Sequence, residues 1–181
     1  MQYVYGVVFV KLNDICNIAR GTRVTRNELN DSNNYPVYQN SLVPLGYFAN
    51  SNQSANTTFV IAAGAAGQVG YSKTDFWAAD DCFCFDCKEL LISRYLYYSL
   101  MKEQAFLLSR VRKASVPRLS RTVLEKMIVA LPSIDKQRQI VDILDRFDKL
   151  CNDISEGLPA EIEARRKQYE YYRDKLLSFN S

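Results

Sequence analysis

Histidine does not occur among the 181 residues of this chain. Without an imidazole, neither a Ser-His-Asp nor a Cys-His catalytic arrangement can form, and metal sites that need a histidine ligand are excluded. The nearest pair of carboxylates, Asp80-Asp81, is better explained as a cap or turn than as an acid–base couple. The motifs of amino-methyltransferases and of Pro-Asp…Glu-x-Lys nucleases are also missing. We therefore predict a binding protein without catalytic residues.

Long apolar runs are missing too, since no stretch approaches the roughly 18 uncharged apolar residues that a membrane helix needs. The apolar first ten residues have no basic start and no cleavage site, so we interpret them as a first strand rather than a signal peptide. Five cysteines, an odd number, argue against a disulfide scaffold and fit a reducing compartment. We expect a cytoplasmic protein that does not contact membranes.

Three of the cysteines fall within six residues, at positions 82, 84 and 87. Thiolates at this spacing could supply three zinc ligands, but a fourth is lacking nearby. The alternation Cys-Phe-Cys-Phe is typical of a strand with small cysteines on one face and aromatic rings on the other. We favour the strand and predict no metal site.

A glycine-rich run covers residues 64–70. It does not match G-x-G-x-x-G, and no Gly-Lys-Ser/Thr follows, so the dinucleotide and P-loop signatures both fail. The run predicts a tight turn between strands at 58–63 and 68–71, where glycine lets another group approach the backbone closely. That group is either a phosphate or base edge, or a neighbouring loop.

The chain changes character near Leu131-Pro132. Before this point, short apolar runs alternate with Asn/Ser/Gly-rich stretches, one helix is predicted over 88–109, and a second starts after Ser120 as its N-cap. We predict an α+β fold: a mixed globular domain at 1–133, with a twisted β-sheet and flanking helices, followed by a long C-terminal coiled-coil helical segment at 134–181.

The C-terminal segment carries apolar residues at alternating steps of three and four, which is a heptad seam. The step from Leu158 to Ile162 breaks the alternation, and Gly157 and Pro159 lie there, so we predict a kink or break between helices near 135–155 and 160–178. One kinked helix and two helices both fit. The seam could pack on its own domain, but its length favours a partner or second copy. The predicted partner-helix residues are Ile140, Leu144, Phe147, Ile154, Leu158, Ile162, Tyr169, Tyr172 and Leu176.

Two stretches of the chain, 20–26 and 110–121, are rich in basic residues and contain no acid. Both fall where strand and helix patterns lapse, so we expect these two basic groups on loops. Duplex DNA is held mainly by such side chains on phosphates, while Arg, Lys, Asn and Gln read base edges. A solvated surface explains any single arginine equally well, but two acid-free groups in one domain favour nucleic acid. The predicted DNA-binding residues are Arg20, Arg23, Arg26, Tyr38, Gln39, Asn40, Gln68, Lys73, Arg110, Arg112, Lys113 and Arg118.

Nearly the whole chain resembles one half of the specificity (S) subunit of type I restriction–modification systems. Residues 11–21 are similar to the family's opening "L-x-D-I … G", and residues 131–141 to its "P-L-x-x-Q-x-x-I" signature. The most specific match is the tail at 157–177, which looks like the conserved spacer helix. Shorter similarities lie at 35–38, 59–69 and 114–120.

The resemblance implies a target-recognition domain followed by a conserved helix, as a half-subunit or as one part of a longer subunit. A full subunit holds two such domains apart by antiparallel helices, so that each reads half of a split DNA site. The implied partners are double-stranded DNA, DNA methyltransferase (modification) subunits, a restriction subunit and a second copy of the chain. The implied cofactors, S-adenosylmethionine, ATP and Mg, belong to the partners. The alternative is a coiled-coil protein-interaction module without DNA specificity.

Overall fold

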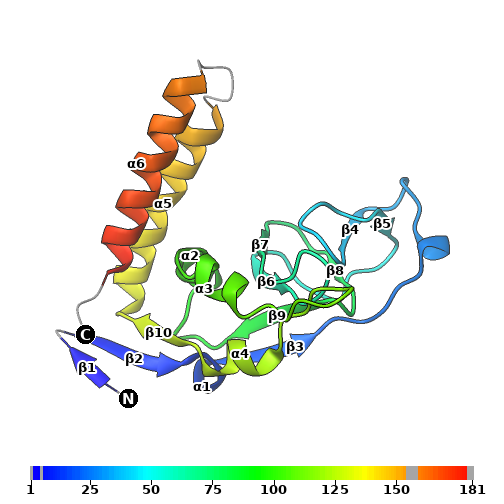
Figure 1. Ribbon diagram of the computed structural model, residues 1–181, viewed down its shortest axis with the longest axis horizontal. Coiled ribbons are helices and arrows are strands. Elements are labelled where there is room, and N and C mark those ends of the chain that lie inside the picture. Colours follow the sequence, from blue (N-terminus) through cyan, green and yellow to red (C-terminus); the bar gives the residue numbers. More distant parts are fainter. Residues whose placement is uncertain (1, 5, 154–158, 179–181) are drawn as a thin grey trace.

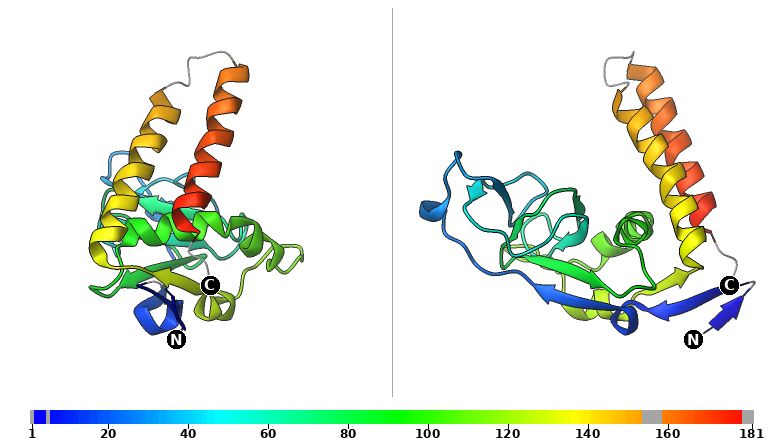
Figure 2. Two further views of the ribbon diagram at one scale, coloured as in Figure 1. Left: turned by 90° about the vertical axis from the view of Figure 1, so that its left-hand side faces the viewer. Right: turned by 180° about the vertical axis from the view of Figure 1, so that it is seen from behind.

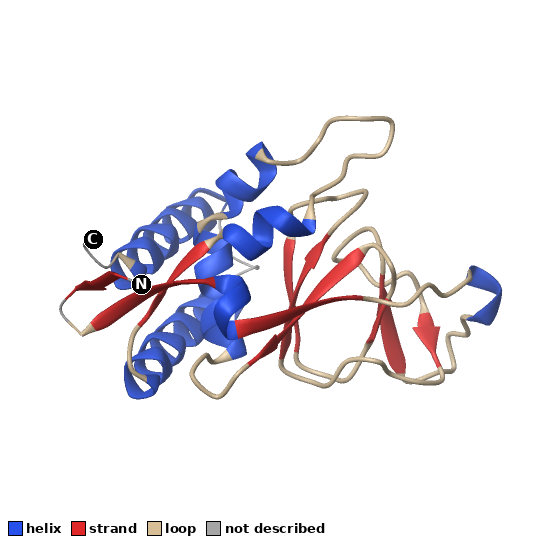
Figure 3. Ribbon diagram, turned by 90° about the horizontal axis from the view of Figure 1, so that it is seen from below, coloured by secondary structure: helices blue, strands red, loops and turns tan. Residues whose placement is uncertain are grey.

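The computed structural model describes residues 2–4, 6–153 and 159–178. It has an elongated body made of three small β-sheets and a two-helix arm that rises from one end of the body (Figure 1). Sheets and helices that are segregated in this way form an α+β fold, which confirms the predicted class. The predicted single sheet is instead three separate sheets, which follow one another along the body (Figure 3).

The central sheet has the strand order β3-β9-β6-β7, and every neighbouring pair is antiparallel. Its strands are β3 (Cys16–Arg20), β6 (Thr57–Ile61), β7 (Val69–Ser72) and β9 (Cys82–Cys87). Phe83 and Phe85 belong to the main core, whereas Cys82 and Cys84 pack on the other face with Phe59. The predicted strands on either side of the glycine turn, and the alternating Cys-Phe strand, are therefore confirmed.

A second sheet, with the order β5-β4-β8, lies at the end of the body away from the arm (Figure 1). Its strands are β4 (Tyr35–Tyr38), β5 (Tyr47–Phe48) and β8 (Trp77–Ala78), and a short 3₁₀ helix η1 (Arg26–Glu28) precedes them. The Asn52 side chain holds β8 in place, because it donates to the Ala78 carbonyl and accepts from the Ala78 N–H, at 2.9 and 2.7 Å.

The third sheet, at the base of the arm, has the order β1-β2-β10. Its strands are β1 (Gln2–Val4), β2 (Val7–Lys11) and β10 (Ile128–Leu131). The single first strand predicted for the first ten residues is thus wrong. Gly6 has a φ of +80°, which turns the chain into a β1–β2 hairpin.

Four helices cover the body: α1 (Leu12–Ile15), α2 (Ser93–Lys102), α3 (Gln104–Ser109) and α4 (Arg121–Lys126). The helix predicted over 88–109 is therefore two helices, which meet at Glu103. The Gln104 side chain donates to the Gly67 carbonyl at 2.6 Å, and this contact holds α3 on the glycine turn. The predicted cap of α4 is confirmed, since the Ser120 hydroxyl accepts from the Thr122 N–H.

The arm consists of α5 (Ile134–Asp153) and α6 (Pro159–Leu177), which run side by side in opposite directions (Figure 2). The rings of Phe147 and Tyr172 stack between them, with centroids 5.4 Å apart. The predicted break is confirmed as two separate helices, and α6 starts at Pro159, where proline's missing N–H costs no helical hydrogen bond. No helix in the described ranges is long and apolar enough to cross a membrane.

The predicted partner seam packs largely within the chain itself. Ile140 and Leu144 are 1% and 0% exposed in the main core, and Tyr169 and Leu176 pack against the same core. Their assignment to a partner helix is corrected, because the reversal of the chain lets α6 and the body cover the apolar face of α5. Outside the described residues lie Ile154, Leu158 and the side chain of Ile162.

The base of the arm is joined to the body by a fully buried amide. The Gln137 side chain donates to the carbonyls of Leu90 and Pro132, both at 2.9 Å, and accepts from the Ile92 N–H at 2.9 Å. The Ile92 N–H at the start of α2 thereby gains a hydrogen-bond partner, and the buried Gln137 amide has partners for both its nitrogen and its oxygen. The main core therefore runs across the predicted division at residue 134.

Arg94 of α2 joins the body to the arm farther from its base. Its guanidinium binds the carboxylates of Asp145 and Asp148 on α5, at 2.7 and 3.2 Å. The guanidinium carbon also lies 4.6–4.7 Å from three ring centroids, those of Tyr71, Tyr97 and Tyr98. Since Tyr71 is on β7, one side chain connects the central sheet, its covering helix and the arm.

The electrostatic setting of Arg94 favours its charged form. Burial alone would lower the pKa of the guanidinium, but the hydrogen bond to Asp145 holds the pKa above its ordinary value. Burial, together with the hydrogen bond that its hydroxyl donates to Asp145, raises the pKa of Tyr98. Cation–π contacts with desolvated rings add to the ion pairs.

We expect Arg94→Met to lower the free energy of unfolding by about 2 kcal/mol. The change keeps apolar bulk but removes the positive charge that pairs with two carboxylates, of which Asp145 keeps only its hydrogen bond from Tyr98 among the contacts described above. The loss is smaller than for a fully buried pair because Asp145 and Asp148 stay 45% and 40% exposed. Urea unfolding provides the measurement. The matched control is Arg138→Met, which breaks an exposed pair with Asp135 and should cost less than about 0.5 kcal/mol. Equal losses in both variants would contradict this role.

Candidate nucleic-acid interface

Several of the predicted DNA-binding residues lie on one side of the central sheet, across the ends of its strands and not along an edge strand. β3 and β6 end at this edge, while β7 and β9 begin there, as the pairings of Arg20 with Phe83 and of Ile61 with Cys82 show. The segments that cross it come from three parts of the chain, around residues 39–40, 62–68 and 110–118. We call this set of segments, with Arg20, the recognition edge.

The basic loop at 110–118 is attached to the recognition edge through its backbone. Arg112 and Arg118 pair with each other in both directions, with N–H to carbonyl distances of 2.8 and 3.2 Å. The Pro117 carbonyl accepts from the Gly64 N–H at 3.1 Å, and the Leu119 N–H donates to the Ala62 carbonyl at 2.8 Å. The loop is thus a short ribbon closed by one β-bridge, which is held by backbone hydrogen bonds and by the packing of the Val111 side chain against the main core.

The cationic side chains of this ribbon face solvent. The exposed residues are Arg110, Arg112, Lys113 and Arg118. In the part of the chain that the structure describes, none of these four forms an ion pair with a carboxylate, although Arg110 lies 4.9 Å over the Phe106 ring. Exposed cations without acidic partners are suited to phosphate contacts, because binding costs no internal salt bridge.

The glycine turn packs against neighbouring loops. Of the two groups expected to approach its backbone, a phosphate or base edge and a neighbouring loop, the structure therefore shows the loop. The Ala65 N–H donates to the Asn40 carbonyl at 2.9 Å. A Cβ on Gly64, whose φ is +81°, would lie 2.8 Å from the Asn40 Cβ and carbonyl oxygen. A Cβ on Gly67 would lie 3.3 Å from the Val111 side chain. The glycines therefore allow three loops to pack together, while Gln68 and Asn40 stay exposed at the surface.

The first basic group is spread along the chain that leaves β3. The Arg20 side chain is half exposed; it donates to the Asp80 carbonyl and lies 4.0 Å from the Asp81 carboxylate. The predicted turn at Asp80-Asp81 is confirmed and supports Arg20. Arg23 and Arg26 are exposed farther along, and η1, which contains Arg26, lies at the end of the body opposite the arm (Figure 1).

Three of the predicted residues differ from expectation. The Tyr38 ring packs 4.8 Å from Phe59 and 5.6 Å from Phe76 between centroids, and burial raises the pKa of its hydroxyl. Tyr38 is therefore partly buried and packs against a hydrophobic cluster of the body. Gln39 is half buried, and its carbonyl accepts the Cys82 thiol. Lys73 follows the far end of β7, so it lies at the opposite edge of the sheet from Gln68.

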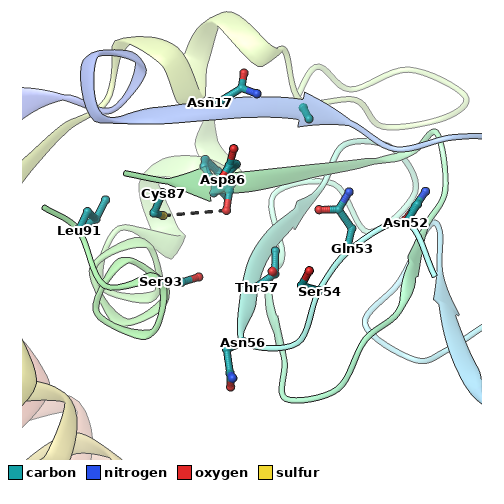
Figure 4. A pocket seen from close by; sticks show the side chains of 12 residues that line it. Asn17, Asn52, Gln53, Ser54, Asn56, Thr57, Asp86, Cys87, Leu91 and Ser93 are labelled. Carbon is teal, nitrogen blue, oxygen red and sulfur yellow. Dashed lines mark hydrogen bonds between the residues drawn. The ribbon is translucent and has the colours of Figure 1, made fainter. Parts of the chain in front are cut away.

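Away from the recognition edge, near the opposite ends of the strands, the central sheet lines a pocket that the sequence did not predict. Its volume is about 480 Å³, and amides, hydroxyls and a carboxylate dominate its lining (Figure 4). Asn17, Gln53 and Asp86 come from β3, from the 50–56 loop and from β9. The Asn/Ser-rich composition of residues 50–56 indicated only a loop, because amide-rich segments are common in loops generally.

Arg94 was also missed by the sequence analysis. Its acidic partners are 51 and 54 residues away, so no local spacing links them. The only available signal was a lone arginine on an aromatic-rich helix, which is equally typical of an exposed position.

A family model described as "Type I restriction modification DNA specificity domain" matches residues 5–164. The chain is 33% identical to the MpnII type I restriction enzyme specificity subunit of Mycoplasma pneumoniae, over 93% of this chain and 52% of that protein. Over 93 residues it is 43% identical to the EcoR124I/EcoR124II type I restriction enzyme specificity subunit of Escherichia coli, which covers 50% of this chain and 23% of that protein. The chain thus spans about half, or less, of these relatives.

Two solved structures share the fold. The S subunit of a type I restriction–modification system from M. genitalium superposes with a TM-score of 0.74 at 16% identity, over 83% of this chain and 41% of that one. The HsdS subunit from Thermoanaerobacter tengcongensis gives a TM-score of 0.67 at 15% identity, over 98% of this chain and 46% of that one.

We expect Gly64→Ala to lower the free energy of unfolding by more than about 2 kcal/mol, because it combines a positive φ with a collision against the Asn40 backbone. Gly6→Ala is the matched control, since Gly6 has nearly the same φ of +80° but no atom within 4 Å of the added Cβ. Thermal unfolding of both variants measures the difference. If Gly64→Ala cost no more than the control, the close packing of these loops would be refuted.

Proposed function

Because the chain belongs to the type I restriction modification DNA specificity family, we propose that it recognises a DNA target through its recognition edge. The observation that carries the proposal is the ribbon at 110–118, which presents exposed cations and is held by backbone hydrogen bonds and by the packing of Val111. Such an arrangement positions charge toward a polyanion without relying on the side chains that would bind it.

Phosphate contacts and base contacts would be divided between the loops. Arg112, Lys113 and Arg118 supply positive charge along the ribbon, which supports phosphate binding. Asn40 and Gln68 are exposed at the same edge, and amide side chains can bind adenine in two places at once. Direct reading of bases is thus assigned to the amides and orientation to the cations.

The chain would act as the targeting part of a larger assembly. DNA methyltransferase (modification) subunits and a restriction subunit are the proposed partners, and S-adenosylmethionine, ATP and Mg would belong to them. The absence of histidine and of methyltransferase motifs from the chain supports this division of labour. The proposed place of action is the cytoplasm, where these partners would meet DNA.

The arm would pair two copies, so that two recognition edges read a bipartite target. Most of the described residues of the pairing surface proposed from the sequence pack within the chain, but Tyr172 stays 36% exposed and the arm carries further apolar side chains on its outside. Ile143 of α5 is 39% exposed, and Tyr171 of α6 is 60% exposed. Exposed apolar groups on a helical hairpin support contact with another helical surface.

Footprinting of the chain together with its modification subunits tests the proposal. We expect protection of one sequence at physiological salt, interrupted by an unprotected spacer. Protection that is equal on all sequences, or no protection at all, would overturn it. Binding to protein partners without salt-dependent DNA binding would favour the protein-interaction module instead.

We expect Lys113→Ala to weaken DNA binding and to reduce the slope of log K against log salt by about one. The reason is the loss of one phosphate contact from a side chain that has no acidic partner in the described ribbon. Fluorescence anisotropy between 50 and 200 mM salt measures the slope. The matched control is Lys167→Ala on α6, where the lysine pairs with Glu163 at 2.8 Å. An unchanged slope for Lys113→Ala would move the DNA surface elsewhere.

We expect the wild-type chain to sediment as a dimer, and Tyr171→Glu to shift it to a monomer, because a buried charge at a helical interface lacks a partner. Sedimentation velocity over a concentration series is the measurement. Ile128→Glu serves as control, since Ile128 is 63% exposed but lies on β10. A monomeric wild-type chain at all concentrations would rule out the arm as a self-association surface.

A further inference from the structure

Two cysteines from distant parts of the sequence meet across the central sheet. Cys16 is the first residue of β3 and Cys87 is the last of β9, and they are register partners in the antiparallel pair. Their sulfur atoms lie 3.3 Å apart, with the Cys16 thiol donating to the Cys87 sulfur. The remaining described pairs of β3 and β9 separate them from Arg20 at the recognition edge.

The hydrogen-bond pattern specifies the kind of pair they form. The Lys88 N–H donates to the Ile15 carbonyl at 3.2 Å, one residue outside the pair. This places Cys16 and Cys87 at a non-hydrogen-bonded position, where Cα atoms of opposite residues are typically about 4.5 Å apart. That spacing lies within the range of about 4.4–6.8 Å that a disulfide spans without backbone movement.

The two thiols differ in their access to solvent. Cys16 is 2% exposed, whereas Cys87 is half buried and lines the 480 Å³ pocket on the far side of the sheet (Figure 4). Figure 4 shows Cys87 beside Asp86 at the wall of this pocket, with its sulfur also near the Phe85 carbonyl. A small molecule that enters the pocket can therefore reach Cys87, but it cannot reach Cys16 directly.

We propose that Cys16 and Cys87 form a dithiol site that small-molecule disulfides oxidise reversibly to an intramolecular disulfide. The chemical class of the reactant is a low-molecular-weight disulfide such as oxidised glutathione. The site does not depend on DNA recognition, and none of its residues belongs to the recognition edge.

The reaction proceeds by two exchanges. The Cys87 thiolate attacks one sulfur of the small disulfide, forms a mixed disulfide and releases one small thiolate, which takes up the proton that Cys87 lost. Cys16 then loses its proton to solvent and attacks the Cys87 sulfur, which releases the second small thiol and closes the Cys16–Cys87 bond. Two protein thiols are oxidised and one small disulfide is reduced to two thiols.

The order of the two steps follows from the surroundings of Cys16. Its hydrogen bond to Cys87 and its burial both raise the pKa of the Cys16 thiol, so Cys16 is the poorer first nucleophile. Once Cys87 carries the mixed disulfide, the neighbouring Cys16 attacks within the molecule, where proximity replaces a bimolecular encounter.

The other buried cysteines of β9 are matched comparisons. Cys82 and Cys84 lie on the opposite face of the strand, and the Cys82 thiol donates to the Tyr38 carbonyl at 3.3 Å. Burial raises the pKa of Cys84 to about 12. We therefore assign oxidation to the Cys16–Cys87 pair and not to these two.

Oxidation would link β3 and β9 of the central sheet by a covalent bond. A bond between residues 16 and 87 closes a long loop, and such cross-links usually raise stability by limiting the unfolded chain. Because the recognition edge lies at the other end of β3 and β9, the bond should leave DNA binding unchanged.

The test treats the folded 181-residue chain with oxidised glutathione, blocks the remaining thiols, and maps tryptic peptides by mass spectrometry. We expect a link between the peptides covering residues 12–20 and 74–88, located at Cys87 by fragmentation and still formed by Cys84→Ala. The midpoint of thermal unfolding should rise by about 5 °C or more and return after reduction. Thiols that all stay reduced, or a link that ends on Cys82 or Cys84, would overturn the proposal.

Two single variants separate the steps. Cys16→Ser should trap one glutathione on Cys87, because the resolving thiol is gone. Cys87→Ser should leave Cys16 free of glutathione, because Cys16 is buried. If Cys87→Ser took up glutathione at Cys16 as fast as Cys16→Ser does at Cys87, the proposed order of attack would be wrong.

Discussion

The contact of Arg94 with both the body and the arm is the constraint on which the architecture depends. Its guanidinium meets carboxylates of α5 and tyrosine rings of β7 and α2, so a single charge spans the sheet, the helix above it and the arm. Gln137 adds a second fixed point at the base of the arm. Charge-assisted hydrogen bonds such as those of Arg94 have strict geometry. The direction of the arm relative to the central sheet is therefore defined.

The recognition edge is built on a different principle. Its loops are held by main-chain hydrogen bonds and by glycines that allow close approach, as the contact of Gly64 with Asn40 shows. Val111 adds apolar packing to that support, whereas the exposed side chains of Arg112, Lys113 and Arg118 form no ion pair within the described residues. Structure and binding are thus assigned to different atoms of the same segment, which is the usual relation between a rigid scaffold and functional loops.

Local patterns predicted much of this molecule. Strand β9 followed from the alternation of Cys and Phe, the cap of α4 from Ser120, and the two arm helices from the break in the heptad seam. Features that depend on distant contacts did not follow. The heptad seam of the C-terminal segment predicted a partner helix, because no local sequence pattern indicates that α6 folds back on α5. Tyr38 was placed with the DNA-binding residues because the rings of Phe59 and Phe76 lie far along the chain.

The backbone anchoring of the ribbon also bears on how such a protein changes over time. Residues 113–117 lie between the paired Arg112 and Arg118, and the Pro117 carbonyl accepts the backbone hydrogen bond of Gly64. Substitutions there exchange the chemical groups offered to solvent without disturbing the core. Substitutions in these five residues would therefore change the charge presented to a phosphate backbone, while the exposed amides of Asn40 and Gln68, which are proposed to contact bases, lie on other segments. In evolutionary terms, the charge on the ribbon and the amides proposed to contact bases can change independently of each other, because they belong to different segments.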